Sequence, residues 1–171
     1  AQRDLIVATR ADGMTSSDSL TVDEAHGTGT ALGGPIEAGS LAAAVLAEQR
    51  PGDTLVCDGI KANLGHGEST AGASGLIRLA LSVTHGEAPP NAQLRALNPH
   101  VRGATRGKPS VMPCQVARGG VASDVRAMES GGVSSFGYSG TIAHAVLAAC
   151  RDKDRVAPAS TNEHPKTALC Y

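Results

Sequence analysis

Residues 22–38, VDEAHGTGTALGGPIEA, carry the strongest local signal for a fold class in this sequence. The first part of this stretch predicts a short buried strand over residues 20–25, and a loop rich in glycine and threonine follows at once. A helix then opens at residues 33–35 and runs to about Glu48, with Pro35 at the first helical position, where its missing N–H is not needed. Strand, tight loop and helix in this order form the repeating unit of layered α/β folds.

The same order recurs further along the chain. Residues 54–60 predict a second buried strand, and the loop KANLGHGE follows at 61–68. Residues 70–85 predict a helix that is apolar on almost every face and ends at Gly86. A helix of that kind belongs in the centre of a domain, with other layers on both sides. The sequence therefore predicts an α/β architecture, a mixed sheet sandwiched between helices.

Composition excludes several classes of protein. The chain has 171 residues, of which 41% are hydrophobic, enough for a globular core. Its net charge of -1 gives no electrostatic reason to expect nucleic acid or an anionic membrane as partner. No apolar run approaches the roughly 20 residues that span a bilayer.

The cysteines and the first residue bear on the cell compartment and on chain length. No CxxC pair exists, so we expect reduced thiols and an intracellular, cytoplasmic protein, with Cys57 packed in the core. The chain does not begin with Met, which predicts that it starts inside a longer protein, whose targeting segment, if it has one, lies upstream. The four cysteines are Cys57, Cys114, Cys150 and Cys170.

Two histidines occupy equivalent places after the predicted strands. His26 follows the first strand directly, and His66 follows the second by a few residues, with Lys61 and Glu68 beside it. Ligands in layered α/β folds gather at the carboxyl ends of strands, so one pocket could hold both imidazoles. Two neutral imidazoles could each donate an N–H to a developing oxyanion.

Three other interpretations remain open from the residues alone. A histidine beside a glycine is often purely structural. Zinc binding lacks an HExxH or CxxC spacing, so no metal site is predicted. The glycine- and threonine-rich loop could cradle a phosphate in a nucleotide-binding domain, but neither GxxxxGK[ST] nor GxGxxG is present.

Four segments resemble one enzyme family. Residues 22–38 are similar to the EAHGTGT.LGDPIEA motif of type I polyketide ketosynthases, and residues 59–68 to their KxNxGHxE motif. Residues 134–144 are similar to SSFGFSGTNAH, and residues 88–100 fit the family's linker. All four occur in the family's order, so the chain resembles the C-terminal half of a β-ketoacyl synthase.

The resemblance implies a fold and a reaction. Residues 1–150 would form the C-terminal half of a thiolase-like layered fold, and residues 151–171 a linker or tail. The family performs decarboxylative Claisen condensation in polyketide or fatty-acid synthesis. An acyl chain rides on an active-site cysteine, and malonyl on an acyl-carrier protein loses carbon dioxide and attacks it through an enolate.

Residues that match the motifs take the family's catalytic roles by resemblance. His26 and His66 match the histidines that stabilise the enolate. Lys61 matches the lysine that organises the second histidine, and Glu68 an acidic residue of the same network.

Four further residues match positions that meet the substrate. Thr28 and Thr30 match threonines that contact the pantetheine arm. Phe136 opens the glycine-rich segment, and Tyr138 replaces the second phenylalanine of that segment, which gates the pocket and whose backbone N–H joins the oxyanion hole. The resemblance implies no directly bound cofactor: the phosphopantetheine arm of the carrier protein delivers the substrate.

Departures from the family pattern limit what the chain is expected to do alone. Nothing matches the TACSS-like elbow of the nucleophilic cysteine, so we expect its own missing N-terminal half as partner, a homodimer when full length, and no activity from this piece alone. Gly34 replaces the family's aspartate, where glycine is an acceptable N-cap, and Ile142 replaces its asparagine. These two changes motivate an alternative, a non-catalytic ketosynthase-like interaction domain.

Overall fold

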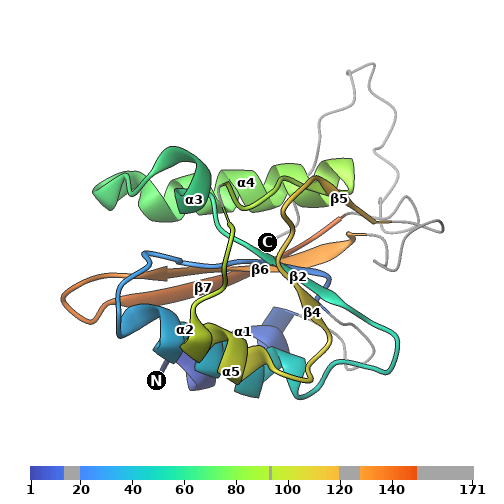
Figure 1. The fold of residues 1–171 in the computed structure, drawn as a ribbon, viewed down its shortest axis with the longest axis horizontal. Coiled ribbons are helices and arrows are strands. Elements are labelled where there is room, and N and C mark those ends of the chain that lie inside the picture. The colour runs from blue at the N-terminus through green and yellow to red at the C-terminus, as the bar shows by residue number, and fades with distance from the viewer. Residues whose placement is uncertain (14–19, 93, 120–127, 150–171) are drawn as a thin grey trace, which may run out of the picture.

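A five-stranded mixed sheet forms the middle of the fold (Figure 1). The computed structural model describes residues 1–13, 20–92, 94–119 and 128–149. The strand order is β4-β2-β1-β6-β7, and all neighbours are parallel except the antiparallel β6–β7 pair. The strands are β1 Val22–Glu24, β2 Leu55–Asp58, β4 Ser110–Val111, β6 Ser130–Phe136 and β7 Ile142–Ala148.

Helices cover both faces of this sheet. Figure 1 shows α3 and α4 on one face and α1, α2 and α5 on the other. A π-helical turn, Ala42–Leu46, extends α2, and a 3₁₀ turn, Glu68–Thr70, precedes α4. The helices are α1 Gln2–Gly13, α2 Gly33–Leu41, α3 Lys61–Leu64, α4 Ala71–His85 and α5 Pro99–Thr105. Two short strands, β3 Glu87–Ala88 and β5 Ala117–Arg118, form a separate antiparallel pair.

The core has two parts, one on each face of the sheet. Leu20, Leu55 and Val45 belong to the part beneath α1 and α2. The part beneath α4 contains Val22 and Leu79. Because successive side chains of a strand point to opposite faces, β2 contributes to both parts, with Leu55 and Cys57 on one side and Val56 on the other. This two-sided burial confirms the predicted α/β layers.

The predicted elements agree with the structure, with one correction at a helix start. The expected strands at 20–25 and 54–60 contain β1 and β2, and α4 ends at Gly86, whose φ of 68° is left-handed. Helix α2, however, begins at Gly33 with Leu32 as its N-cap residue. Pro35 is therefore the third helical residue rather than the first, and Gly34 lies inside the first turn rather than at the cap.

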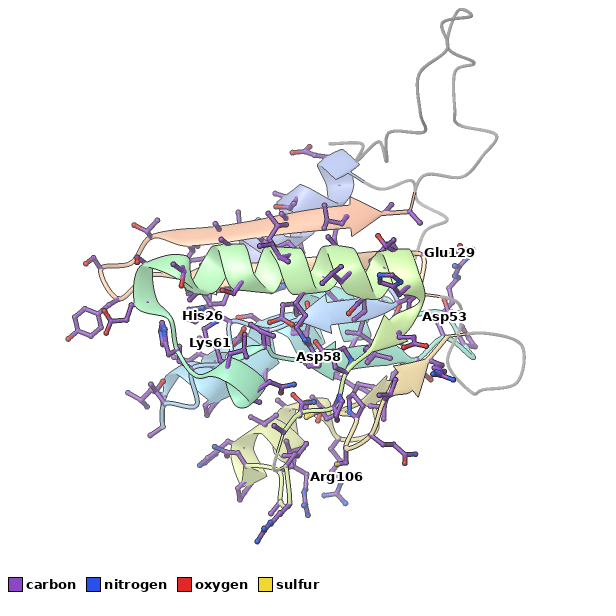
Figure 2. All side chains as sticks on the ribbon, turned by 90° about the horizontal axis from the view of Figure 1, so that it is seen from above. His26, Asp53, Asp58, Lys61, Arg106 and Glu129 are labelled. Carbon is purple, nitrogen blue, oxygen red and sulfur yellow. The ribbon has the colours of Figure 1, made fainter. Side chains whose placement is uncertain are left out.

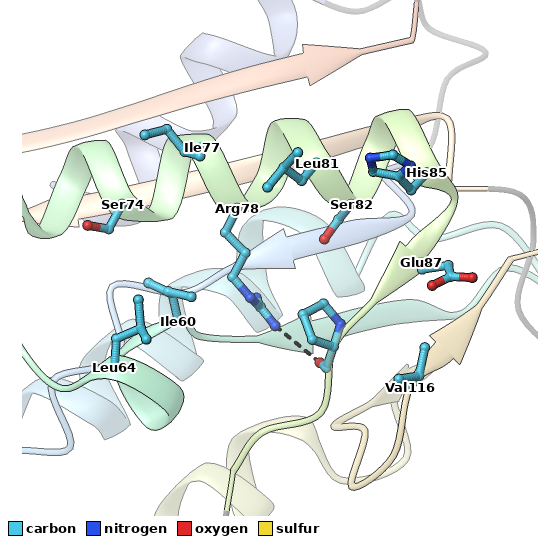
Figure 3. Close-up of a pocket in the computed structure, with 11 residues that line it drawn as sticks. Ile60, Leu64, Ser74, Ile77, Arg78, Leu81, Ser82, His85, Glu87 and Val116 are labelled. Atoms are coloured by element: carbon cyan, nitrogen blue, oxygen red, sulfur yellow. Dashed lines mark hydrogen bonds between the residues drawn. The ribbon is translucent and has the colours of Figure 1, made fainter.

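Helix α4 departs from the expected burial on all sides. Its inner face packs on the sheet, but Leu76, Ile77 and Leu81 are 41%, 62% and 53% exposed. Ile77 and Leu81 line a groove of about 550 Å³ that also includes Leu64 and Val116 (Figure 3). Within the described ranges nothing covers this apolar face, so the helix has only one of the two layers that its sequence predicts.

No helix in the described part of the chain is both long and apolar enough to cross a membrane. Residues 150–171, for which we expect a linker or tail, lie outside the described residues.

Candidate functional site

The structure brings the two predicted histidines together. Parallel β1 and β2 lie side by side, so their carboxyl ends meet at one edge of the sheet. His26 follows β1 by two residues, and His66 follows the short helix α3. Their ring centroids lie 5.9 Å apart with the planes at 89°, and the Phe136 ring lies 5.6 Å from His26 on another side.

Both rings line one cavity of about 520 Å³. Glu68, Phe136 and Tyr138, three of the other residues predicted from the sequence, also line it. The Tyr138 side chain is fully exposed at the rim. The complete lining is His26, His66, Glu68, Ala71, Ser135, Phe136, Gly137 and Tyr138.

The backbone fixes which nitrogen of His66 carries the proton. The Glu68 N–H donates to Nδ1 of His66 at 2.9 Å, so Nδ1 is an acceptor and the proton of the neutral ring sits on Nε2. Glu68 adopts a φ of 46° in this turn, an unusual value for a residue other than glycine. Its carboxylate is exposed and, among the described residues, hydrogen-bonds to neither histidine. Glu68 therefore acts on His66 through its backbone rather than through its charge.

A carboxylate from the next helix holds the His26 loop. Glu37 of α2 accepts hydrogen bonds from the N–H of His26 at 2.5 Å and of Gly27 at 3.0 Å. Gly27 and Gly29 take φ values of 58° and 70°, which glycine adopts without strain. Sequence reasoning missed this role of Glu37, although the signal existed, since an acidic residue follows the loop in the first turns of a helix.

The His26 ring is held in its neutral form. Burial, together with the charges of Lys61 and His66, lowers its pKa to about 4. A neutral imidazole carries one N–H donor and one acceptor nitrogen. Near neutral pH both rings can therefore face the same cavity without the repulsion of two cations.

Lys61 lies nearer to the His26 side of the site than the resemblance implies. It is the first residue of α3, and Figure 2 shows it close to His26 at one end of the molecule. Burial lowers its pKa, which the charges of Glu24 and Glu37 partly offset. Within the described ranges its ammonium forms no hydrogen bond to His66. Its influence on the site is electrostatic and acts on His26.

The two threonines lie in the loop after His26 but outside the histidine cavity. The Thr30 hydroxyl accepts a hydrogen bond from the Gly33 N–H at 3.0 Å, which joins the loop to the start of α2. Thr30 also lines a second cavity of about 320 Å³ on the far side of the loop. Thr28 is half-buried in the same loop.

A buried ion cluster beneath both histidine loops was not predicted from the sequence. Arg78 of α4 contacts the carboxylates of Glu24, at the end of β1, and Asp58, at the end of β2. It also donates to the Pro89 carbonyl at 3.1 Å (Figure 3). Glu24 in turn accepts from the Ile60 N–H at 2.7 Å. The only hint in the sequence is an arginine within an otherwise apolar helix.

Cys57 is a packed core thiol, as predicted. It is 5% exposed on the α1–α2 side of the sheet. Burial raises its pKa well above the usual value, and the charges of Asp23 and Asp58 add to the effect. A thiol of this kind is a poor nucleophile because the thiolate is disfavoured. No cysteine of the described residues lines the histidine cavity, and no cluster there suits a metal ion.

Comparison with known proteins points to one family. The model of the family described as beta-ketoacyl synthase, C-terminal domain, matches residues 1–95. The highly reducing polyketide synthase cm3B of Cordyceps militaris is 41% identical over 152 residues, which is 89% of this chain and 6% of that protein. The 6-methylsalicylic acid synthase of Penicillium terrestre is 37% identical over 154 residues, which is 87% of this chain and 8% of that protein.

Solved structures agree with this match. Ketosynthase twelve of the bacillaene polyketide synthase from Bacillus amyloliquefaciens superposes with a TM-score of 0.75 at 29% identity, covering 88% of this chain and 26% of that one. An oxazolomycin ketosynthase domain from Streptomyces albus gives a TM-score of 0.72 at 32% identity, covering 86% and 26%. The chain thus spans about a quarter of these solved ketosynthases and a small part of the polyketide synthases.

Proposed function

Because the chain belongs to the C-terminal domain family of the β-ketoacyl synthases, in the form found in type I polyketide synthases, we propose that it supplies the enolate-stabilising histidines of a decarboxylative condensation. The observation that carries this proposal is the pair of imidazoles, 5.9 Å apart, facing one cavity. The reaction would be an acyl transfer in which a malonyl thioester loses carbon dioxide.

The chemistry of the cavity suits this step. When the carboxylate leaves as carbon dioxide, its bonding electron pair passes to the α-carbon and is delocalised onto the thioester oxygen. His66 presents an N–H at Nε2, since Nδ1 accepts from the Glu68 backbone. His26 is neutral, because burial lowers its pKa to about 4. Two such donors aimed at one oxyanion stabilise charge that exists only after decarboxylation begins.

Phe136 contributes a dry wall beside His26, with the ring centroids 5.6 Å apart. Excluding water strengthens hydrogen bonds to a developing charge and protects the enolate from solvent protons. Tyr138 at the rim would meet the incoming thioester first. We propose that Thr28 and Thr30, on the loop next to His26, contact the pantetheine arm of an acyl-carrier protein.

The nucleophile would come from residues outside these 171. Cys57 is buried on the α1–α2 side of the sheet, away from the histidine cavity. The same outside part, an N-terminal half of the synthase, would cover the exposed side chains of Ile77 and Leu81 on α4. Alone, therefore, this chain would neither accept an acyl group nor condense two of them, and the working enzyme would be a homodimer of the full-length protein.

Single-histidine variants of the full-length protein test this proposal. His66→Ala and His26→Ala should each reduce malonyl decarboxylation by about 100- to 1000-fold, the usual cost of one oxyanion donor. Acylation of the cysteine, followed by mass spectrometry, should be largely retained. His100→Ala is the matched control, because His100 is exposed on α5. Unchanged decarboxylation in both site variants would reject the assignment of the two rings.

A non-catalytic interaction domain is the second candidate. It is motivated by Gly34, which leaves open space where a side chain could stand, and by Ile142 at the start of β7. Its prediction is opposite: the wild-type full-length protein would release no carbon dioxide from malonyl carrier protein. Decarboxylation that depends on His66 would reject it.

A further inference from the structure

A second group of polar side chains lies buried on the α1–α2 side of the sheet, away from the histidine cavity. Asp23 of β1 and His144 of β7 approach Gly132 of β6 from two sides. A Cβ atom at position 132 would lie 2.9 Å from Cε1 and 3.1 Å from Nε2 of His144, and 3.4 Å from Oδ1 of Asp23. The imidazole therefore lies over the bare glycine, and the carboxyl group reaches the same spot from the neighbouring strand.

Both groups have an unused polar atom at that spot. Asp23 is 3% exposed, and neither its Oδ1 nor Nε2 of His144 has a hydrogen-bond partner among the described residues. The other ring nitrogen, Nδ1, lies 3.0 Å from the Ser134 hydroxyl. A buried polar atom without a partner is costly, so two such atoms around one point call for a common explanation.

We propose that Asp23 and His144 share a single proton over Gly132 through one bridging water molecule, and so connect β1 to β7. A carboxyl group and an imidazole complement each other in either arrangement, as acid and acceptor or as carboxylate and donor. The Ser134 hydroxyl can donate to or accept from Nδ1, so it fits both arrangements.

This pair links the two strands that carry residues on opposite sides of the proposed active site. β1 leads into His26, three residues after Asp23, and the β6–β7 hairpin carries Phe136 and Tyr138 at its turn. Strand β6 lies between β1 and β7, and because Gly132 has no side chain, Asp23 and His144 can approach each other across it. The proposal goes beyond the condensing reaction, because it concerns a buried device that holds the scaffold of both loops.

The surrounding charges determine how the pair responds to pH. The titratable and charged groups on the same side of the sheet are Arg10 from α1, Glu37 from α2 and Cys57 from β2, and the charges of Asp58 and Glu24, which bind Arg78 on the α4 side, also act on the pair. Burial, followed by the charge of Arg10, lowers the pKa of His144 to about 4. Burial, followed by Glu37, Asp58 and Glu24, raises the pKa of Asp23 well above its usual value. In the folded pair the proton therefore favours Asp23 over His144.

The sign of the pH dependence follows from proton counting. In the unfolded chain the aspartate titrates near pH 3.9 and the histidine near pH 6.5. Between these values both states hold about one proton, so the pair does not make the unfolding free energy depend on pH. Above about pH 6.5 the unfolded chain has lost both protons, so a folded pair that shares one, as proposed, loses stability as pH rises. Below about pH 4 both states take up a second proton, because the pKa of His144 in the folded protein is also about 4, so the pair adds no further pH dependence there.

Thermal unfolding of the full-length protein across pH 5–9 tests the proposal. The Asp23→Asn variant has no carboxyl group to ionise at this position, so it should reduce the fall in unfolding midpoint that the wild type shows above pH 6.5. Asp12→Asn, at an exposed site on α1, is the matched control and should leave that loss in place. His144→Gln and the double variant complete a cycle in which the second substitution should lower the midpoint less than it does alone. Additive effects, or an unchanged alkaline slope in Asp23→Asn, would overturn the proposal.

A direct measurement covers the case in which these variants fail to fold. The ¹⁵N resonances of His144 in the wild-type protein at pH 5.5 should differ from those of exposed His100, because the shared proton is held within the pair. If His144 instead titrates freely near pH 6.5, as an isolated imidazole does, no proton is shared and the proposal is wrong.

Discussion

The two loops that carry the histidines are built differently, although each follows a parallel strand and precedes a helix. The His26 loop is held by a distant carboxylate, Glu37, which binds two of its N–H groups. The His66 loop is held by its own backbone, through the N–H of Glu68. One ring therefore depends on tertiary packing and the other on a local turn. Two histidines in equivalent places of a layered fold can therefore differ in how strongly mutations elsewhere in the chain affect them.

The largest effect is expected from a substitution in the ion cluster that lies beneath both loops. Arg78 contacts Glu24 and Asp58, the last residues of the strands that lead into both loops. Arg78→Met would leave two buried carboxylates without their cation, which we expect to lower the unfolding free energy by about 3–5 kcal/mol. Chemical denaturation of the full-length protein measures this.

Arg102→Met is the control for that experiment, because Arg102 is exposed on α5. Its unfolding midpoint should match the wild type. If Arg78→Met proves as stable as Arg102→Met, the ion cluster does not stabilise the two loops, and each loop is held by its own contacts.

The next largest effect is expected from a substitution that disturbs the His26 loop but not the His66 loop. Glu37→Ala removes the acceptor of the His26 and Gly27 N–H groups, whereas among the described residues Glu37 makes no hydrogen bond to the His66 loop. We expect malonyl decarboxylation to fall by about 100-fold, as after loss of one oxyanion donor, because His26 loses its position. Steady-state release of carbon dioxide measures it.

Glu37→Gln sharpens this test. Its amide keeps one acceptor oxygen and turns an NH₂ group toward the second N–H, so an intermediate loss is expected. Equal losses in the alanine and glutamine variants would show that the charge of Glu37 matters, rather than its hydrogen bonds.

A smaller effect follows from the burial of His26. Its pKa is lowered to about 4 in the folded protein, so the folded state binds fewer protons than the unfolded chain between about pH 6.5 and 4. Stability should therefore fall as pH drops through this window. His26→Gln should reduce that fall, which unfolding midpoints at pH 7 and pH 4.5 can reveal. The same acid slope in both proteins would mean that His26 titrates normally.

Much of the architecture followed from the sequence because the strands, loops and helices have strong local signals. Residues 22–38 alone predicted a strand, a loop and a helix, and Gly86 marked the end of α4. The pairing of Arg78 with Glu24 and Asp58 could not be predicted, since its members are 54 and 20 residues apart and no local pattern links them. Glu37 lies only 11 residues after His26, and its place in the first turns of the helix after the loop was a signal that the prediction did not use. The exposed outer face of α4 was not predicted either, because its apolar residues indicated burial but not which residues would cover them.

The smallest expected effect concerns Glu68, where the resemblance and the geometry give different roles. The resemblance implies an acidic residue in a network with His66, whereas the structure gives the contact to the backbone N–H, with the carboxylate exposed. Glu68→Gln removes the charge and keeps the N–H, so decarboxylation should change by less than about threefold, within the range of exposed charge effects. Glu68→Gly also keeps the N–H and takes the φ of 46° without strain, so it should be equally active. A large loss in both variants would show that the side chain itself acts in the reaction, and the His66 loop would then depend on more than its own backbone.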